Sequence, residues 1–181
     1  MNMNMMMKEI PQNGLSQKGS KNTEGMENSK FQENITVEEI QEYELSWFKG
    51  DRVVVEDLKT FRQVIIRLRS EKVLGFDTES RPSFKKGHKN KVSLIQLASG
   101  DLACLFRINI IGIPDELVAI LADPSVIKAG VAVHDDIRFL KKIKKFNPEG
   151  FIDLQGYVKN FGIQSSGLKK LTAIILGFRI S

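Results

Sequence analysis

The sequence predicts an α/β fold in which an antiparallel meander of strands joins parallel strands, with helices packed on the sheet. Three extended apolar segments follow one another between residues 72 and 108, and short strands then alternate with amphipathic helices as far as residue 176. Consecutive strands favour antiparallel pairing, whereas alternation with helices favours parallel pairing. With 181 residues, of which 41% are hydrophobic, the chain is long enough for one domain with a sizeable core.

The first 30 residues differ in composition from the remainder. All six Met lie within residues 1–26, and every aromatic residue lies at or after Phe31. A segment without aromatics that is rich in Asn, Gln, Lys, Gly and Ser buries too little apolar surface to offset its chain entropy. We therefore expect a disordered tail over residues 1–30 and one domain over residues 31–181.

The first elements of the domain follow a short Glu-rich segment to which no structure is assigned. Residues 53–55 predict a short strand, and Asp57 can cap the helix that follows. Apolar residues of that helix recur at the 3.6-residue period: Leu58, Phe61, Val64, Ile65 and Leu68.

The three extended segments are "KVLGFDTE", "KVSLIQLAS" and "LACLFRI", and only Ser99, Gly100 and Asp101 separate the last two. That spacing predicts a hairpin. The later pattern predicts a helix over residues 114–121, a strand at "IKAGVAV", a helix over residues 135–145 and a short segment "FIDL". Helices over residues 154–161 and 168–176 are expected to follow.

Composition also limits the partners and the location. The balance of 27 Lys and Arg against 22 Asp and Glu gives a net charge of +5, which favours a polyanionic partner. No stretch approaches the roughly 20 apolar residues of a membrane span, so no membrane association is expected. The start "MNMNMMMKEI" lacks the apolar core of a secretory signal. The single Cys104 lies in the apolar run "LACLF", which suggests a small buried hydrophobe in a reducing compartment. An intracellular location is expected, cytoplasmic or associated with the nucleoid or nucleus.

Two carboxylates, Asp77 and Glu79, stand at the end of the apolar strand "VLGF". Residues i and i+2 of a strand project from the same face, about 6.6 Å apart along the chain, so the two acids form a pair. An isolated Asp-x-Glu is more often a solvated strand end. Here the strand before it has a core pattern and Gly75 allows close packing, which favours a pocket at this end.

A third acid, Asp136, lies in the helix predicted near residue 135. It shares a stripe with Phe139, Leu140 and Ile143, whereas Asp135 shares a face with Arg138 and suits the N-cap. Both acids can simply complement the helix dipole. An inward carboxylate nevertheless needs a partner, and a metal ion is one candidate. Carboxylates without a His or Cys cluster favour Mg²⁺ or Mn²⁺. Two such ions about 4 Å apart can activate a water and stabilise the leaving oxygen of a phosphodiester.

The segments "GFDTES" and "KAGVAVHDDIRFL" resemble the first and second motifs of the DEDD-type 3′-to-5′ exonucleases, in the ribonuclease D and Werner-syndrome-type branch. "VSLIQLAS" resembles the strand between those motifs. The resemblance implies a ribonuclease H-like fold and a two-metal exonuclease acting on single-stranded 3′ ends, of DNA or RNA. It also implies that Asp77 bridges both ions, that Glu79 binds the ion on the side of the nucleophile and that Asp136 helps to hold the second ion.

The chain departs from this family in one respect. The third family motif, Tyr-x-x-x-Asp, is absent, since Tyr157 is followed four residues later by Phe161. We therefore expect a chain that is incomplete at its C-terminus and weakly active or inactive. The alternative is a catalytically inert module that binds nucleic acid or another partner and keeps the nuclease fold.

Other features are weaker indicators of function. The basic segments "KKGHKNK" (residues 85–91) and "KKIKK" (residues 141–145) suit a phosphate backbone but are more often solvated faces. Neither His88 nor His134 has the spacing of a zinc ligand. Walker, dinucleotide-binding and Gly-x-Ser-x-Gly motifs are absent from the sequence.

Overall fold

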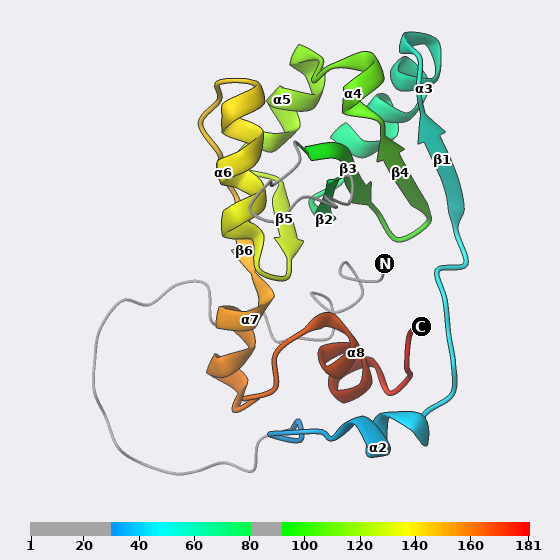
Figure 1. Ribbon diagram of the computed structural model, residues 1–181, viewed down its shortest axis with the longest axis vertical. Helices are drawn as coiled ribbons and strands as arrows, with labels where there is room; N and C mark the ends of the chain where they lie inside the picture. Colours follow the sequence, from blue (N-terminus) through cyan, green and yellow to red (C-terminus); the bar gives the residue numbers. More distant parts are fainter. Residues whose placement is uncertain (1–29, 81–91) are drawn as a thin grey trace, which may run out of the picture. The chain divides into compact units, whose positions relative to one another are not determined.

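The computed structural model describes residues 30–80 and 92–181 (Figure 1). The expected tail over residues 1–30, except Lys30, and the basic segment with His88 lie outside the described residues. The described chain forms two compact units. Residues 48–153 form one, called here the sheet unit, and residues 30–47 with 154–181 form the other, called the helical unit.

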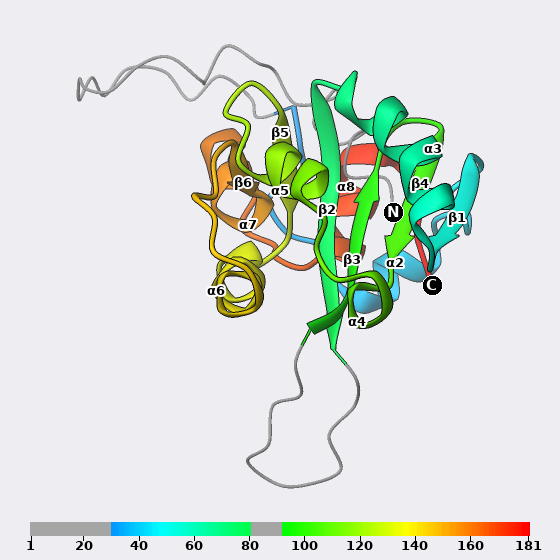
Figure 2. The ribbon, with the colours of Figure 1, turned by 90° about the horizontal axis from the view of Figure 1, so that it is seen from above.

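A six-stranded mixed sheet organises the sheet unit, with the strand order β1-β4-β3-β2-β5-β6. Strands β2, β3 and β4 form the antiparallel meander (Figures 1 and 2), while β1 pairs with β4, β5 with β2 and β6 with β5 in parallel. The predicted α/β class and the predicted hairpin are both confirmed. The strands are β1 (Asp51–Val55), β2 (Val73–Ser80), β3 (Val92–Ala98), β4 (Leu102–Phe106), β5 (Ile127–Gly130) and β6 (Phe151–Asp153).

The helices of the sheet unit are α3 (Leu58–Arg69), α4 (Ile108–Ile111), α5 (Asp115–Leu121) and α6 (Val133–Ile143). The Asp57 carboxylate caps α3 as predicted, because it accepts a hydrogen bond of 2.8 Å from the backbone N–H of Thr60. The single turn α4 was not predicted: only its first residue, Ile108, fell in an expected extended segment, and no structure was assigned to residues 109–111.

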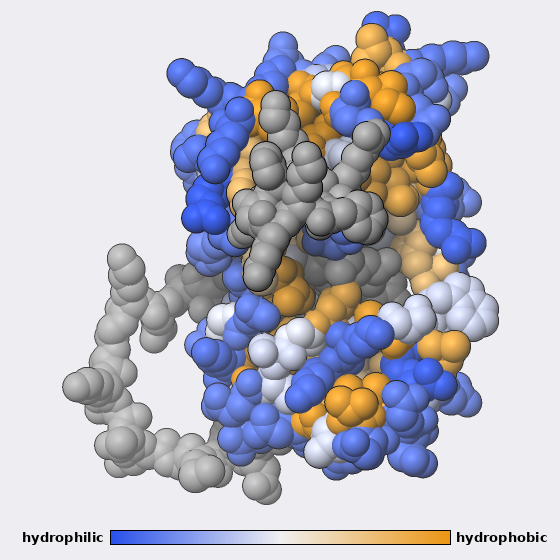
Figure 3. All heavy atoms as spheres, viewed as in Figure 1, coloured by the Kyte–Doolittle hydropathy of each residue, from blue (hydrophilic) through white to orange (hydrophobic). Residues whose placement is uncertain are grey.

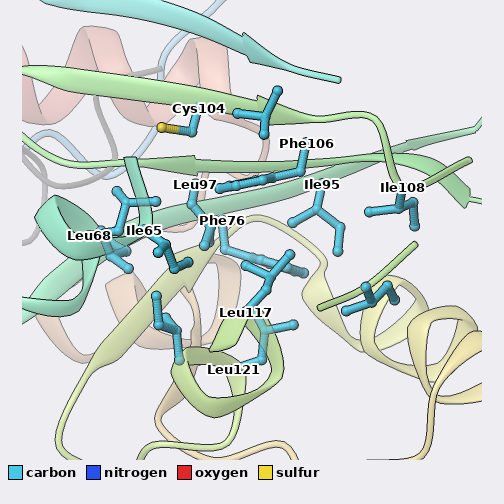
Figure 4. Close-up of a cluster of buried hydrophobic side chains, with 14 of the residues drawn as sticks. Ile65, Leu68, Phe76, Ile95, Leu97, Cys104, Phe106, Ile108, Leu117 and Leu121 are labelled. Carbon is cyan, nitrogen blue, oxygen red and sulfur yellow. The ribbon is translucent and has the colours of Figure 1, made fainter. Parts of the chain in front are cut away.

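The core lies between one face of the sheet and the helices packed on it (Figure 4). Paired residues on neighbouring strands project to the same side, and the register aligns Phe76 with Leu97 and Leu97 with Cys104. This face is buried against α3 and α5, which contribute Ile65, Leu68, Leu117 and Leu121. Asp77 and Glu79 therefore project from the opposite face of β2.

The thiol of Cys104 is part of this core and is fully buried. Burial raises its pKa to about 12, so the thiol stays protonated at neutral pH. This agrees with the interpretation of Cys104 as a small buried hydrophobe.

Lys128 on β5 is also fully buried. Its ammonium donates hydrogen bonds of 2.7 Å to the backbone carbonyls of Asp123 and Val126, and it lies 5.2 Å from the ring centre of Phe151. Gly150, with φ of +67°, leaves room for this contact, because a Cβ there would lie 2.4 Å from the Val126 carbonyl oxygen. Lys128 thereby ties the turn before β5 to the start of β6.

The helical unit contains α2 (Val37–Gln41), α7 (Leu154–Tyr157), the 3₁₀ helix η2 (Val158–Phe161) and α8 (Leu168–Leu176). A capping box begins α2, since Thr36 and Glu39 each bond the backbone N–H of the other. The spacing Thr-x-x-Glu in the Glu-rich segment was the overlooked signal for this helix. Ile35 and Ile40 pack with Ala173 of α8 in a small core. In the part of the chain that the structure describes, no helix has the length and apolar character needed to cross a bilayer.

Candidate metal and nuclease site

The predicted acid pair lies where expected, near the C-terminal end of β2, the strand between β3 and β5. Asp77 is partly buried and Glu79 is exposed. The register pairs Asp77 with Gln96 and Glu79 with Leu94, so both acids stand on the face of the sheet opposite to the core. The local sequence explains this, because the apolar residues that precede the acids fix which face of β2 is buried.

A hollow lies beside Asp77 on this face. Small side chains of three adjacent strands leave the space, since Gly75, Ala98 and Ala103 all line it. Gln96 and Leu105 also contribute to its wall. Asp77 thus lines a small recess that is open where the glycine and the two alanines replace larger side chains.

Asp136 reaches the same strand end from helix α6, but it does so through Thr78. The Thr78 hydroxyl donates a hydrogen bond to Oδ1 of Asp136. Thr78 alternates with the two acids along β2 and projects from the other side of the strand. The structure therefore brings Asp136 to the strand that carries the acid pair, where it is held by a residue between the two acids.

The three carboxylates influence one another electrostatically. The pKa of Asp77 is raised to about 6. Burial is the main cause, and the negative charges of Asp136 and Glu79 add to it. Burial likewise raises the pKa of Asp136, to which the charges of Asp135 and Glu79 add, while the Thr78 hydrogen bond acts in the opposite direction. Negative charges that are close together and partly desolvated favour a bound cation.

The helix that carries Asp136 begins earlier than predicted. It starts at Val133 with Ala132 at its N-cap, so Asp135 lies within the first turn and pairs with Arg138 at 3.0 Å. The expectation that Asp135 is the N-cap is therefore wrong. The inward stripe includes Leu140, but Ile143 is 42% exposed, because the helix ends there.

Two residues were missed in the sequence: one bonds a site acid directly, and the other bonds the turn that precedes Asp136. Thr78 was treated only as the spacer between two acids. Asp153, in the segment "FIDL", ends β6 and accepts a hydrogen bond of 3.2 Å from the backbone N–H of Ala132. The available signal for Asp153 was its position directly after the apolar strand residues Phe151 and Ile152, since Asp77 likewise follows the apolar run of β2.

The chemistry of the donors suits a hard divalent cation, because Asp77, Glu79 and Asp136 offer only carboxylate oxygens. Their mutual repulsion would be relieved by such an ion. Across residues 30–80 and 92–181, however, no three acidic, His or Cys side chains lie close enough together to hold one metal ion. The donor types fit a metal, whereas the side-chain positions do not form a closed coordination sphere.

The basic segment at the end of α6 has a mixed role. Lys141, Lys142 and Lys145 are exposed, and hydrophilic residues cover the side of the sheet unit on which α6 lies (Figure 3). Lys144 is instead used internally, since its ammonium donates to the Ile113 carbonyl at 2.8 Å and to Asp115 at 2.6 Å. Three of these four lysines therefore remain accessible to a phosphate backbone.

This strand order is that of a ribonuclease H-like domain, and the similar solved structures are exonuclease domains. The exonuclease domain of Nibbler from Aedes aegypti superposes with a TM-score of 0.60 at 23% identity, and the exonuclease domain of EXD2 with 0.55 at 30%. In both cases the match covers 72% of this chain and 72% of the other.

The sequence agrees with the fold. A family model described as 3′-5′ exonuclease matches residues 52–181. The chain belongs to this family, in the DEDD branch that the two sequence motifs predicted.

Two curated relatives support the same assignment. The chain is 33% identical over 93 residues to the bifunctional 3′-5′ exonuclease and ATP-dependent helicase WRN of Mus musculus. It is 35% identical over 111 residues to the exonuclease 3′-5′ domain-containing protein 2 of Drosophila melanogaster. These matches cover 50% and 60% of this chain but only 7% and 19% of the two relatives.

Proposed function

We propose that the protein is a two-metal-dependent 3′-to-5′ exonuclease that hydrolyses phosphodiester bonds at single-stranded 3′ ends of nucleic acid. The observation that carries this proposal is that Asp77 and Glu79 stand near the end of β2, where the hydroxyl of Thr78 between them bonds Asp136 of α6. Family membership gives the reaction class. Soaking of the EXD2 exonuclease domain with Mn, and with Mg and GMP, supports the choice of metal.

Each residue has a part in this proposal. Asp77 and Glu79 would hold the metal ions from β2. Asp136 supplies a third carboxylate from α6, and Thr78 orients it. Bound Mg²⁺ or Mn²⁺ supplies activation of a water molecule and stabilisation of the leaving oxygen.

The proposed partner is a nucleic-acid strand. The net charge of +5 and the exposed lysines of α6 suit binding to its negatively charged phosphate backbone. Ribonuclease D from Trypanosoma brucei has been crystallised with an RNA, U12, and the EXD2 domain with dGMP as well as GMP. DNA and RNA both remain as substrates of the proposed reaction.

We further propose that these 181 residues on their own turn over slowly. They supply three carboxylates, whereas the family pattern adds an Asp and a Tyr that positions the attacking water. Fewer ligand charges weaken Mg²⁺ binding, and loss of water positioning removes general-base help of about 10²-fold or more.

A second candidate is a binding module that keeps the nuclease fold without turnover. One observation favours it: the described residues contain no group of three side chains placed to hold a metal. In this case the Thr78 bond to Asp136 is a structural contact between β2 and α6.

The experiment that tests the proposal uses an oligonucleotide labelled at its 5′ end, with Mn²⁺ or Mg²⁺ and at high protein concentration. An exonuclease gives a ladder that shortens from the 3′ end, and Asp77→Asn abolishes it. Asp123→Asn, at a carboxylate in the turn between α5 and β5, is the matched control and keeps the ladder. Strand binding without any metal-dependent ladder, unchanged in Asp77→Asn, would refute the exonuclease and support the binding module.

A further inference from the structure

We propose that Asp153 is a positioning residue that holds the turn before α6 and thereby places Asp136 at the end of β2. The inference rests on the proposed function for its consequence, metal binding by Asp136. Its structural part concerns only contacts within the sheet unit.

The turn between β5 and α6 is short and lies close against β2. Strand β5 ends at Gly130 and α6 begins at Val133. A Cβ on Gly130 would lie 2.6 Å from the carbonyl oxygen of Phe76 and 2.4 Å from Cγ1 of Val133. Only glycine allows this approach, so the start of the helix is fitted tightly against the residue that precedes Asp77.

Ala132, within this turn, has φ of 58° and ψ of 40°. It is the only residue other than glycine with a positive φ in the described part of the chain. A residue with a Cβ disfavours this left-handed conformation, so another interaction must hold it. Helix α6 has no side-chain cap at its N-terminus, so its N-cap supplies no such interaction.

The carboxylate of Asp153 supplies that interaction. Its Oδ1 accepts the Ala132 N–H at 3.2 Å, and its Oδ2 lies 3.4 Å from Nδ1 of His134 in the first turn of α6. Asp153 is paired in register with Gly130, so β6 presents the carboxylate directly at the turn. Its side chain is only 17% exposed. The contact therefore connects a strand to the backbone that starts the helix.

Asp136 lies four residues after Ala132, one helical turn along α6. A change in the turn at Ala132 therefore shifts or rotates the carboxylate that accepts the Thr78 hydrogen bond. By this route Asp153 acts on the candidate metal site through Asp136 without joining the metal ligands.

The test compares Asp153→Ala, Asp153→Asn, Ala132→Gly and the double variant Asp153→Ala with Ala132→Gly. The first readout is Mn²⁺ affinity measured by electron paramagnetic resonance well below the melting temperature. We expect Asp153→Ala to weaken Mn²⁺ binding about tenfold or more, as removal of groups that orient a metal ligand does at other metal sites. Asp153→Asn keeps an oxygen acceptor and should bind nearly as wild type.

Rescue separates positioning from general stability. A glycine at position 132 adopts the left-handed conformation unaided, so Ala132→Gly should restore most of the Mn²⁺ affinity that Asp153→Ala loses. Asp123→Ala removes a different carboxylate that accepts a backbone N–H, that of Ser125, and should lower the melting temperature without changing Mn²⁺ affinity. Asp153→Ala with unchanged affinity, or a double variant without rescue, would overturn the inference.

A metal-free readout keeps this inference distinct from the proposed function. The carboxyl carbon resonance of Asp136 reports its hydrogen bond to Thr78 in the presence of a chelator. Asp153→Ala should shift this resonance, and Ala132→Gly should return it. If Asp77→Asn leaves Mn²⁺ binding unchanged, the proposed function fails. The positioning role is then still supported if the Asp136 resonance shifts in Asp153→Ala and returns when Ala132→Gly is added. A resonance that does not move in Asp153→Ala overturns that role.

Discussion

The hydroxyl of Thr78 donates a hydrogen bond to Oδ1 of Asp136, and this bond joins the strand of the acid pair to helix α6. Thr78 stands between Asp77 and Glu79 but projects from the opposite side of β2. The third acid is thus linked to the pair by the residue that separates the two.

Replacing Thr78 by Val removes this hydrogen bond while nearly preserving the shape of the side chain. Because the bond opposes the rise in the pKa of Asp136, that pKa should move further upward in Thr78→Val. The free energy of unfolding should fall by about 1 kcal/mol. Titration of the Asp136 carboxyl carbon by NMR in chelator checks the pKa, and Thr78→Ser, which keeps the hydroxyl, should match wild type.

Asp77 should make metal-free stability depend on pH. Its pKa in the folded chain is raised to about 6 from an ordinary value of 3.8, so between these values the folded state binds the proton more strongly than the unfolded state. Stability from this group therefore rises as pH falls through 6 and is absent at pH 7.5.

Asp77→Asn should accordingly be more stable than wild type at pH 7.5 in chelator. After discounting for partial exposure, the gain is about 1 kcal/mol, or about 2–4 °C in melting temperature. The gain should shrink towards pH 4.5. A difference that is constant between pH 7.5 and pH 4.5 in thermal melts would show that Asp77 is not the titrating group.

Lys128→Met should destabilise the sheet unit most clearly at alkaline pH. Burial lowers the pKa of Lys128 to about 8, so near pH 9.5 the folded state holds a largely neutral amine, and the loss measured is that of its hydrogen bonds. Two buried carbonyls would lose their donor, at a cost of about 2–4 kcal/mol.

Near pH 7 the difference between wild type and Lys128→Met should be smaller. Lys128 is then largely charged, and this charge is buried in the folded wild type but solvated in the unfolded chain, which lowers the stability of the wild type. Denaturant melts at both pH values provide the measurement. Lys141→Met, at an exposed lysine of α6, is the control and should change neither melt. An equal loss at both pH values would contradict the lowered pKa.

Gly130→Ala should be destabilising by about 1–3 kcal/mol, because its Cβ would meet the Phe76 carbonyl oxygen at 2.6 Å, a backbone atom that cannot rotate away. Gly156→Ala is the matched control. A Cβ at Gly156 meets nothing within 4 Å, and that residue lies in helix α7, where alanine is favoured by about 0.5–1 kcal/mol. Equal melting temperatures for the two variants would show that the turn at Gly130 is looser than described.

Most of the sheet was predictable because its signals are local. The apolar runs of β2, β3 and β4 and the three-residue hairpin turn are visible in the sequence, and the predicted helix over residues 168–176 matches α8. The start of α6 was not predictable in this way. The left-handed Ala132 is held by Asp153, which lies 21 residues later in the chain, so no local pattern reveals it.

For the candidate site too, the features set by local patterns were predictable and those set by distant contacts were not. Alternation along β2 was sufficient to pair Asp77 with Glu79, and the helical period was sufficient to turn Asp136 inward. The role of Thr78 depends on how closely α6 approaches β2, which the sequence does not encode locally. The central claim that remains for experiment is our proposal that the three acids act as one metal site.

The most direct test of that claim is a double-mutant cycle on Mn²⁺ affinity with Asp77→Asn, Asp136→Asn and the double variant. If the two acids share one site, each single variant weakens binding strongly, and the double variant binds little more weakly than either. Affinities that multiply independently, or an Asp136→Asn variant that binds Mn²⁺ as wild type does, would contradict a shared metal site.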